Sequence, residues 1–398
     1  MTTRLRTAYR GPEAPIGFVH GEPVYPIAGS RRSGTHTAGD VLVNQTADGV
    51  SLTTVWNEFV ETLRMYNEHR LAIMRLLAFP TTVSLDVVQQ AVSGARFELA
   101  SEFGEPVGMR PAPDTLLIGY SRGDYDLAVR YTWRFLRDAT YEQLAATHET
   151  ALEGDNRHIT ERVQAALLSN TTRENEEGKT VFPLYNGDTF VPPPYLGKVH
   201  TAGHTHYLTT QGALDSSDLE SAIRHITHHG YGRRSGSQLL ILANESESRV
   251  IQRFVRGETS GDGAVSSFDF VPSTDAPAFL TEKTIVGLRP PGEFGGLRVA
   301  GSLGPAWLVE TDFMPAGYIA VVASEGPDSR ANPVGFREHP NLAYRGLRIL
   351  PGNGSYPLVN SFYSRTFGVG VRHRGAACVV QVTSAAVSDY TPPTFDLP

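Results

Sequence analysis

The feature that most constrains this chain is a long amphipathic stretch, YEQLAATHETALEGDNRHITERVQAALL, at residues 141–168. Thr140 with Gln143 matches a capping box. At about 1.5 Å per residue the predicted helix would be roughly 42 Å long, although Gly154 costs about 1 kcal/mol in a helix interior. Such a helix is typical of an elongated spine. Charged residues lie opposite an apolar stripe formed by Leu144, Ala151, Leu152, Ile159, Val163 and Leu167.

The segment before this helix, residues 93–138, predicts a long two-stranded hairpin. ARFELASEF alternates in polarity, and TLLIGYSRGDYDLAVRYTWRF is rich in β-branched and aromatic residues. Gly and Pro concentrate between these two runs, which places a broad tip at Gly104–Pro113. An isolated two-stranded ribbon is only marginally stable in water. We therefore expect it to lie against another surface, and a neighbouring subunit would serve.

The N-terminal part of the chain changes character near residue 53. Residues 1–50 show no sustained periodicity and are rich in Gly, Pro, Thr and Arg. We expect them to form an extended arm that is ordered only by contact with another surface. From Thr53 apolar residues recur at helical spacing, which predicts an amphipathic helix ending near Phe79-Pro80.

From about residue 212 the chain has the pattern of an α/β region. Ser217 with Glu220 predicts a capped helix over 218–229. Gly230 follows it and suits the left-handed position at a helix end.

Strands dominate the remainder of the chain. QLLILAN (238–244) predicts a buried strand whose last residue, Asn244, caps a helix running to about Phe254. Further strand-like runs, TIVGL, LRVAG, AWLVE and GYIAVVA, lie within 284–324. FGVGVRHRGAACVVQVTS predicts two closing strands around a turn near Arg374-Gly375, before a Pro-rich tail.

Composition narrows the class of protein. The 398 residues are 40% hydrophobic and 19% charged, which is ordinary for a globular chain of about two or three domains. No run of about 18 apolar residues occurs, so we expect no membrane span, and the N-terminus lacks the pattern of a secretory signal. The single cysteine, Cys378, is interpreted as a small buried strand residue.

Charge disfavours a nucleic-acid-reading role. The net charge is −7 and no basic block occurs, whereas proteins that read nucleic-acid sequence carry a basic face. Among 35 basic residues the lysines are Lys179, Lys198 and Lys283, and the others are arginine. A GC-rich genome produces this bias through codon usage. Arginine also suits ion-paired interfaces, because its planar group binds carboxylates bidentately.

Histidines gather in one short region. Six of the 13 histidines are His200, His204, His206, His225, His228 and His229. The first three lie in a Gly/Thr-rich loop or strand edge, at a spacing that lets neutral imidazoles bind zinc or iron. The last three lie in a final helical turn, where cations are favoured. A metal site of the first three is one interpretation; structural or interfacial histidines are the one we favour.

Other catalytic motifs lack their structural context. Gly119-Tyr120-Ser121-Arg122-Gly123 fits G-x-S-x-G, but a nucleophile elbow opens a helix, and DYDLAVRYTW, which follows, is typical of a strand. We interpret Ser121 as part of a turn or bulge in the ribbon. Asp124 and Asp126 fit solvated turn residues as well as an acid/base pair. No phosphate-binding loop and no CxxC pair occurs, so the motifs give an enzyme interpretation little support and we assign no catalytic residue.

Five stretches, in chain order, carry a family resemblance: SEFGEPVGMRP, YDLAVRYTWRFLRDAT, VFPLYNGDTFVPPPYLGKVH, HTHYLTTQGALDSSDLESAIRHITHHGYG and FGVGVRHRGAACVVQVT. With the order arm, ribbon, spine helix and α/β region, they resemble the Hong Kong 97-type major capsid proteins of tailed double-stranded DNA bacteriophages, specifically those of high-GC hosts. The resemblance implies an α+β fold with these parts: N-arm (1–52), N-terminal helix and lead-in (53–92), E-loop hairpin (93–138), peripheral domain with the spine helix (139–210), α/β axial domain (211–345), and return strands with a C-terminal tail (346–398).

The resemblance implies a structural protein rather than an enzyme. Copies would assemble in the host cytoplasm as hexamers and pentamers of the icosahedral virion shell. The implied partners are a portal protein, a scaffolding protein and a cement or decoration protein, with packaged DNA held by weak, non-specific contact that suits the negative charge. Residues 1–52 are too few for a long fused scaffolding domain, so we expect the scaffold to be a separate protein.

The resemblance also makes the ribbon an inter-subunit contact. Its candidate contact residues are Arg96, Glu102, Glu105, Met109, Arg110, Asp124, Arg130, Arg134 and Arg137. Some family members join subunits covalently through an E-loop lysine and an asparagine. No lysine precedes Lys179, so we predict no isopeptide cross-link of that type and a shell held by non-covalent contacts.

Two alternatives stay open. An encapsulin-like nanocompartment would use the same fold to enclose an enzyme, and the contents of purified particles, genomic DNA or a cargo protein, separate it from a phage shell. From a different class, a soluble metal-dependent enzyme would use His200, His204 and His206. Metal analysis with a His204→Ala control would decide between that enzyme and a capsid.

Overall fold

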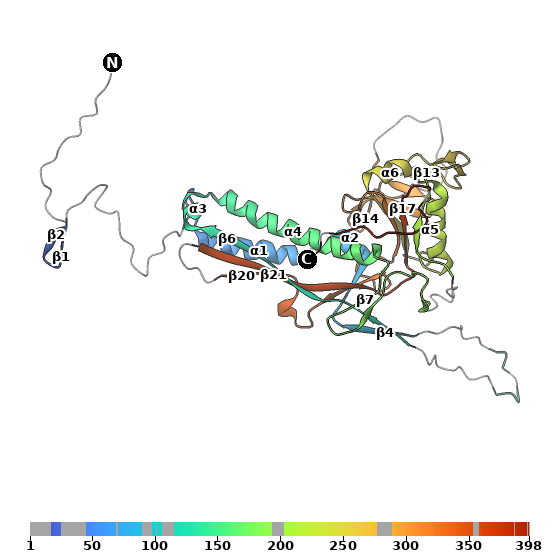
Figure 1. Ribbon diagram of the computed structural model, residues 1–398, viewed down its shortest axis with the longest axis horizontal. Helices are drawn as coiled ribbons and strands as arrows, with labels where there is room; N and C mark the ends of the chain where they lie inside the picture. The colour runs from blue at the N-terminus through green and yellow to red at the C-terminus, as the bar shows by residue number, and fades with distance from the viewer. Residues whose placement is uncertain are drawn as a thin grey trace, which may run out of the picture.

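The molecule is elongated, with a long helix-and-sheet part that leads to a globular α/β part (Figure 1). The computed structural model describes residues 17–24, 45–68, 71–89, 98–100, 102–105, 115–192, 203–276, 289–352, 358–385, 387–395 and 397. In these residues, no helix combines the length and the apolar character needed to cross a membrane.

The longest helix, α4, confirms the predicted spine. The backbone N–H of Thr140 donates to Gln143 Oε1 at 3.0 Å, and every residue of the predicted apolar stripe except the half-buried Leu152 is buried. The helices of the described residues are α1 (Leu52–Glu68), α2 (Ala72–Leu77), α3 (Trp133–Asp138), α4 (Tyr141–Leu168), α5 (Ser216–His228) and α6 (Glu245–Ile251), with a 3-10 turn at Leu342–Tyr344.

In the helix-and-sheet part, α1 and α4 lie along a β-sheet (Figure 1). Its strand order is β20–β21–β19–β3, and β6 pairs with β21 antiparallel, from Leu358 opposite Thr132 to Phe367 opposite Gly123. Leu63 of α1 packs with Ala151 of α4 and Tyr363 of β21. The strands of this sheet are β3 (Ala78–Thr81), β6 (Gly123–Thr132), β19 (Val334–Glu338), β20 (Leu347–Pro351) and β21 (Leu358–Val371).

The globular part is built on a seven-stranded sheet with the order β13–β16–β17–β10–β18–β22–β9. Successive side chains of a strand point to opposite faces, so Leu240 and Val322 join a core with α2 and α4, whereas Ile241 and Val321 join a core with α5. Both faces are thus covered by helices. The strands are β9 (Tyr207–Thr209), β10 (Gln238–Ala243), β13 (Phe270–Pro272), β16 (Gly301–Leu303), β17 (Ala306–Glu310), β18 (Tyr318–Ser324) and β22 (Ala377–Gln381).

The remaining strands form small two-stranded sheets. Their pairs are β1 (Gly17–Val19) with β2 (Glu22–Val24), β4 (Leu85–Gln89) with β5 (Thr115–Gly119), β7 (Arg173–Glu174) with β8 (Thr180–Val181), β11 (Thr259–Ser260) with β12 (Ala264–Val265), and β14 (Glu293–Phe294) with β15 (Leu297–Arg298). The β1–β2 hairpin lies within the N-terminal segment for which only extended chain was predicted.

The predicted hairpin over 93–138 is wrong in its bounds. The antiparallel pair is β4–β5, with Leu85 opposite Gly119, and most of the predicted tip lies outside the described residues. The chain after Gly123 pairs with β21 and then forms α3. An alternating pattern shows that a strand has a partner but not which one, and here the partner lies far along the chain.

The helix predicted from Thr53 to Phe79-Pro80 is also wrong at its end. The segment holds two helices, α1 and α2, and then strand β3, which pairs in parallel with β19. Phe79 is 1% exposed, so apolar residues that fit a helical spacing are buried here by a strand. Tertiary pairing overrides the local pattern.

The cap of α5 lies earlier than predicted. Asp215 accepts from the backbone N–H groups of Ser217 and Asp218, and Asp218 caps in return. Glu220, the predicted partner of Ser217, instead accepts from the backbone N–H and hydroxyl of Ser267. Gly230 has a φ of 97°, which confirms its predicted left-handed position.

The predictions for the later strands are mostly confirmed. β10, β17 and β18 match their apolar runs, and Asn244 caps α6, which ends at Ile251 rather than near Phe254. TIVGL (284–288) lies outside the described residues. The two closing strands, β21 and β22, flank the predicted turn but belong to different sheets, so they do not pair with each other.

Candidate functional site

The β4–β5 ribbon leaves the body of the molecule from a fixed base (Figure 1). Arg372 Nε donates to Asp86 Oδ2 of β4 at 2.6 Å. Asn175 Nδ2 donates to the backbone carbonyls of Ser84 and Tyr120, both at 3.1 Å. Tyr120 itself is fully buried. The base therefore holds the direction in which the ribbon projects.

Beyond this base the chain exposes large apolar side chains. Leu99 is 98% exposed and Phe103 is 95% exposed, and the predicted contact residues Glu102 and Glu105 beside them are exposed as well. Exposed apolar groups with a charged rim mark a protein contact surface. The sequence prediction missed Leu99 and Phe103, although the alternation in ARFELASEF places both on one side of a strand.

The outer edge of β6 is a second candidate contact surface. Among the described strands, β6 pairs with β21 alone, so its other edge carries backbone groups available to another chain. Leu127 is 48% exposed, and the predicted contact residues Arg130 and Arg134 are exposed nearby.

Other predicted contact residues have partners within the chain or lie outside the described part. Asp124 accepts from the Thr366 hydroxyl across the β6–β21 pair at 2.5 Å. Arg137 pairs with its neighbour Asp138 at 2.7 Å, with both side chains mostly exposed. The predicted residues outside the described part are Arg96, Met109, Arg110 and His200.

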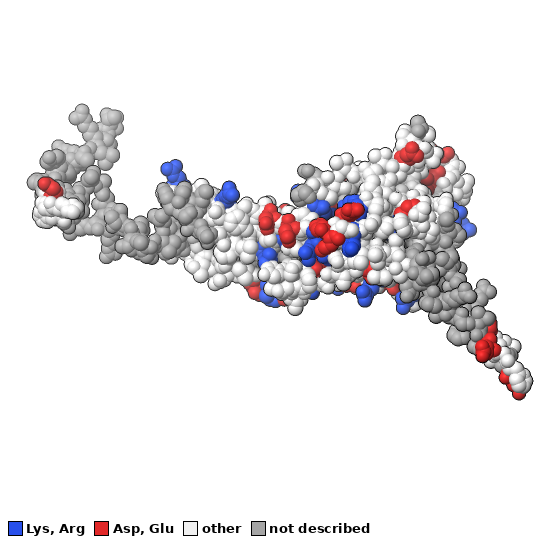
Figure 2. All heavy atoms as spheres, turned by 60° about the horizontal axis from the view of Figure 1, so that its bottom comes forward, with Lys and Arg blue, Asp and Glu red and all other residues white. Residues whose placement is uncertain are grey.

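Charges of both signs are intermixed over the middle of the face shown in Figure 2. Buried arginines contribute to the fold by joining segments that are distant in sequence. Arg374 is 1% exposed and lies 2.6 Å from Asp188, and Arg337 lies 2.5 Å from Glu177. Burial of arginine requires such pairing, so part of the arginine content serves ion pairs within one chain.

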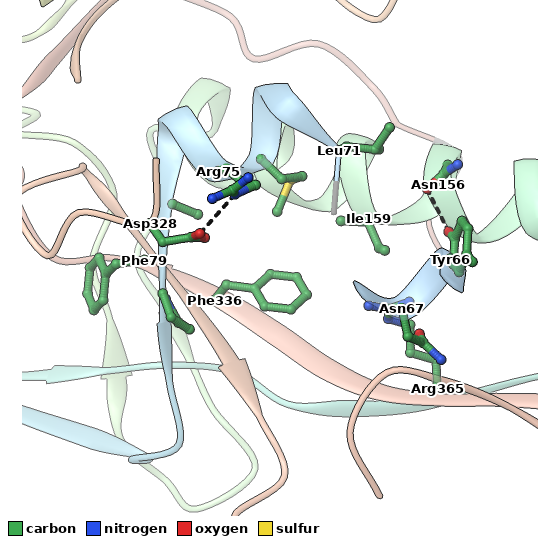
Figure 3. A pocket seen from close by; sticks show the side chains of 13 residues that line it. Tyr66, Asn67, Leu71, Arg75, Phe79, Asn156, Ile159, Asp328, Phe336 and Arg365 are labelled. Atoms are coloured by element: carbon green, nitrogen blue, oxygen red, sulfur yellow. Dashed lines mark hydrogen bonds and ion pairs between the residues drawn. The ribbon is translucent and has the colours of Figure 1, made fainter. Parts of the chain in front are cut away.

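A cavity of about 480 Å³, part of it open solvent, lies where α1, α2, α4 and β19 meet (Figure 3). Phe336 and Ile159 provide apolar walls. Polar groups in its lining contact one another: the Tyr66 hydroxyl oxygen lies 2.6 Å from Asn156 Oδ1, and Arg75 pairs with Asp328 at 2.9 Å. These pairs link helices and strands, and they contain no nucleophile with a base.

The histidine region is brought together by the fold, with a different membership from the predicted one. His204 and His206 lie just before β9 and meet His229 at the end of α5; one ring nitrogen from each lies within 4.8 Å of the others. His204 Nε2 and His229 Nε2 are 2.9 Å apart. The signal for His229 was its place at a helix end in the same short region, but only the fold brings it to the loop.

Electrostatics keep these imidazoles neutral. Burial lowers the pKa of His206 to about 3 and that of His229 to about 3. His206 Nδ1 lies 2.7 Å from the carbonyl oxygen of Ala377, and His225 Nδ1 lies 2.7 Å from that of Ser221. A carbonyl oxygen only accepts, so Nδ1 of each ring donates a proton, and in the neutral ring of His206 the lone pair lies on Nε2.

The other residues considered for catalysis or redox chemistry lie in strands or between strands of the fold. Ser121 lies between β5 and β6, where its hydroxyl donates to the carbonyl of Val369 at 2.8 Å. It lies beyond the end of the β4–β5 pair, so it is not the predicted turn or bulge of the ribbon, and strand β6 follows it where a nucleophile elbow would open a helix. Asp124 and Asp126 are exposed residues of β6. Cys378 is fully buried in β22, which confirms its interpretation, and burial raises the pKa of its thiol.

Comparison with solved structures finds a close likeness. A solved chain from Mycobacterium phage Patience is 39% identical, with a TM-score of 0.67, and the match covers 92% of this chain and 97% of that one. This chain belongs to the major capsid proteins of tailed bacteriophages. The capsid protein has the predicted Hong Kong 97-type α+β fold. It self-assembles, and its place is the shell of the virion.

Likenesses at greater distance are to other shells. A chain of the native GTA particle capsid is 14% identical, with a TM-score of 0.45, over 79% of the capsid protein and 90% of that chain. A chain of an encapsulin complex from Synechococcus elongatus is 14% identical, with a TM-score of 0.39. That match covers 81% of the capsid protein and 89% of the encapsulin chain. No protein-family model and no curated protein matches the capsid protein.

Proposed function

We propose that this capsid protein forms the hexamers and pentamers of an icosahedral shell that encloses phage genomic DNA. The observation that carries the proposal is the exposure of Leu99, 98%, and of Phe103, 95%, in the segment between β4 and β5. Side chains of this size gain roughly 1.5–3 kcal/mol each on full burial. A neighbouring copy in a closed, head-to-tail ring is the surface that can cover them.

The proposed domains of the subunit follow its two main sheets. We assign α4 and the sheet that contains β21 to a peripheral domain. We assign the β4–β5 ribbon to the E-loop and residues 1–52 to an N-arm. The seven-stranded sheet corresponds to the axial domain; it contains β9 and β22, so this domain draws on segments on both sides of the 211–345 range. The fixed ribbon base at Asp86 and Arg372 suits an E-loop that reaches across to a neighbour.

The proposed partners are a portal protein, a separate scaffolding protein and a cement protein. Assembly takes place in the host cytoplasm and involves no catalysis and no cofactor. The net charge of −7 supports weak, non-specific contact with packaged DNA. Retention of the DNA in the shell then depends on contacts between the protein subunits. That the host genome is GC-rich stays a prediction.

Electron microscopy of the expressed chain, alone and with its scaffolding protein, tests the proposal. The matched variants are Phe103→Asp and Phe103→Leu. We expect Phe103→Asp to give folded subunits that do not form closed shells, because a charge would be buried at the contact. Phe103→Leu keeps an apolar side chain and should assemble. Normal shells from Phe103→Asp, or purified particles that hold a cargo protein in place of DNA, would contradict the proposal.

A further inference from the structure

The spacing of the histidine nitrogens suits one metal ion. In a tetrahedral site with Zn–N bonds of about 2.0–2.1 Å, neighbouring ligand nitrogens are about 3.4 Å apart. One ring nitrogen from each of His204, His206 and His229 lies within 4.8 Å of the others, and Nε2 of His204 is 2.9 Å from Nε2 of His229. These distances bracket the required value, so small side-chain rotations bring all three to one ion. We propose that His204, His206 and His229 form a zinc site that joins the loop before β9 to the end of α5.

The hydrogen bonds around the cluster orient its rings as ligands. Histidines that bind a metal usually donate their other ring N–H to a carbonyl or carboxylate, which fixes the tautomer. His206 does so through Nδ1 to the Ala377 carbonyl at 2.7 Å, which leaves Nε2 for the ion. Ala377 begins β22, which is paired on both sides, with β18 and β9, so this support is held within the sheet.

A fourth ligand is close at hand. The His225 ring centroid lies 5.3 Å from that of His204 and 5.8 Å from that of His206. Its Nδ1 hydrogen-bonds to the Ser221 carbonyl at 2.7 Å, so Nε2 is the nitrogen that would bind the ion. Either this nitrogen or a water molecule completes four-coordination, the number that zinc favours.

The donor set selects the class of metal. The cluster in the described residues consists of imidazoles, which suit zinc, copper and nickel, whereas calcium and magnesium require oxygen ligands. His206 and His229 are deeply buried, at 0% and 1% exposure. The site is structural, because the ion would link an edge strand of the sheet to a covering helix. It does not depend on the proposed shell assembly.

The test uses the full chain after removal of metal with a chelator. Titration with Zn²⁺ should show one ion bound per chain, with a higher thermal unfolding midpoint in the loaded protein. Co²⁺ in place of Zn²⁺ should give the intense visible absorption of a tetrahedral site. The ligand variant is His204→Gln, which replaces a half-buried ring by a side chain that can still hydrogen-bond. The matched control is His228→Gln, at an exposed histidine of the same helix end.

We expect His204→Gln to weaken zinc binding at least about 10-fold, the lower range for loss of a supporting group, and His228→Gln to leave it unchanged. Equal binding by the two variants would overturn the site. So would a chain that takes up no zinc, in which case the cluster is a set of hydrogen-bonded neutral imidazoles. If His204→Gln does not fold, the cobalt spectrum of the unaltered chain decides, and absence of tetrahedral absorption rejects the proposal.

Discussion

Arg365 on β21 and Asp155 on α4 form a buried ion pair, with 2.5 Å between Arg365 Nη1 and Asp155 Oδ2. Their side chains are 8% and 7% exposed. The Tyr66 hydroxyl of α1 donates to the same carboxylate oxygen at 2.8 Å. Burial raises the pKa of Asp155, although Arg365 acts in the opposite direction. The Asp155 carboxylate thus links α4 both to α1 and to β21 of the neighbouring sheet.

Asp155→Ala should lower the free energy of unfolding by about 3–5 kcal/mol, because it leaves the Arg365 charge buried without its carboxylate partner. Urea unfolding followed by circular dichroism measures the change. The control is Asp138→Ala, which removes the exposed partner of Arg137 and should cost less than about 1 kcal/mol. Equal losses in the two variants would show that the buried pair has no special role.

The same substitution at two glycines should have opposite effects. A Cβ at Gly154 in α4 would meet nothing within 4 Å, so Gly154→Ala should stabilise the chain by about 0.5–1 kcal/mol through helix propensity. A Cβ at Gly335 in β19 would lie 2.3 Å from Cε1 of buried Tyr120, so Gly335→Ala should destabilise it by about 1–3 kcal/mol or more. Thermal unfolding compares them, and changes of the same sign would contradict this packing.

Boiled particles should run as a single band near 43.3 kDa on SDS gels. The reason is chemical: an isopeptide bond needs a lysine amine, and no lysine precedes Lys179, so the ribbon has none to supply. A ladder of covalent oligomers would show that Lys179, Lys198 or Lys283 takes that role from elsewhere in the chain.

Stability should fall as the pH is lowered from 6.5 to about 4, because four histidines have pKa values well below 6.5 in the folded chain: near 4 for His158 and His373, and near 3 for His206 and His229. Burial is the main cause in all four; Arg162 and Arg365 add to it at His158, and Arg372 at His373. The unfolded chain takes up these protons near the ordinary pKa of 6.5, so stability present above that pH is lost as the pH falls toward the folded value.

Thermal midpoints across this pH range measure the effect, and His158→Gln removes one titrating ring. Tyr125 and Phe367 pack against that ring, at centroid distances of 4.4 and 5.4 Å, so the variant also loses packing. The informative quantity is therefore the dependence of the midpoint on pH. It should be shallower in His158→Gln, and an identical slope would mean that His158 does not contribute.

Local features of the sequence determined the spine helix. Thr140, Gln143 and the apolar stripe lie within one continuous segment, and each acts on neighbours within a few residues, so capping and periodicity predicted both ends of α4. The same holds for the Asn244 cap and the left-handed Gly230. The family resemblance likewise needed only short stretches in order.

Tertiary structure alone decided which distant segments meet. The β-branched and aromatic residues of Gly123–Thr132 predicted a strand, but only the fold made β21 its partner and placed the ribbon at β4–β5. In the same way it joined Asp155 to Arg365 and carried His229 to His204. The physical reason is that side-chain patterns specify which faces must be buried, whereas the choice among distant partners depends on how the whole chain packs at once.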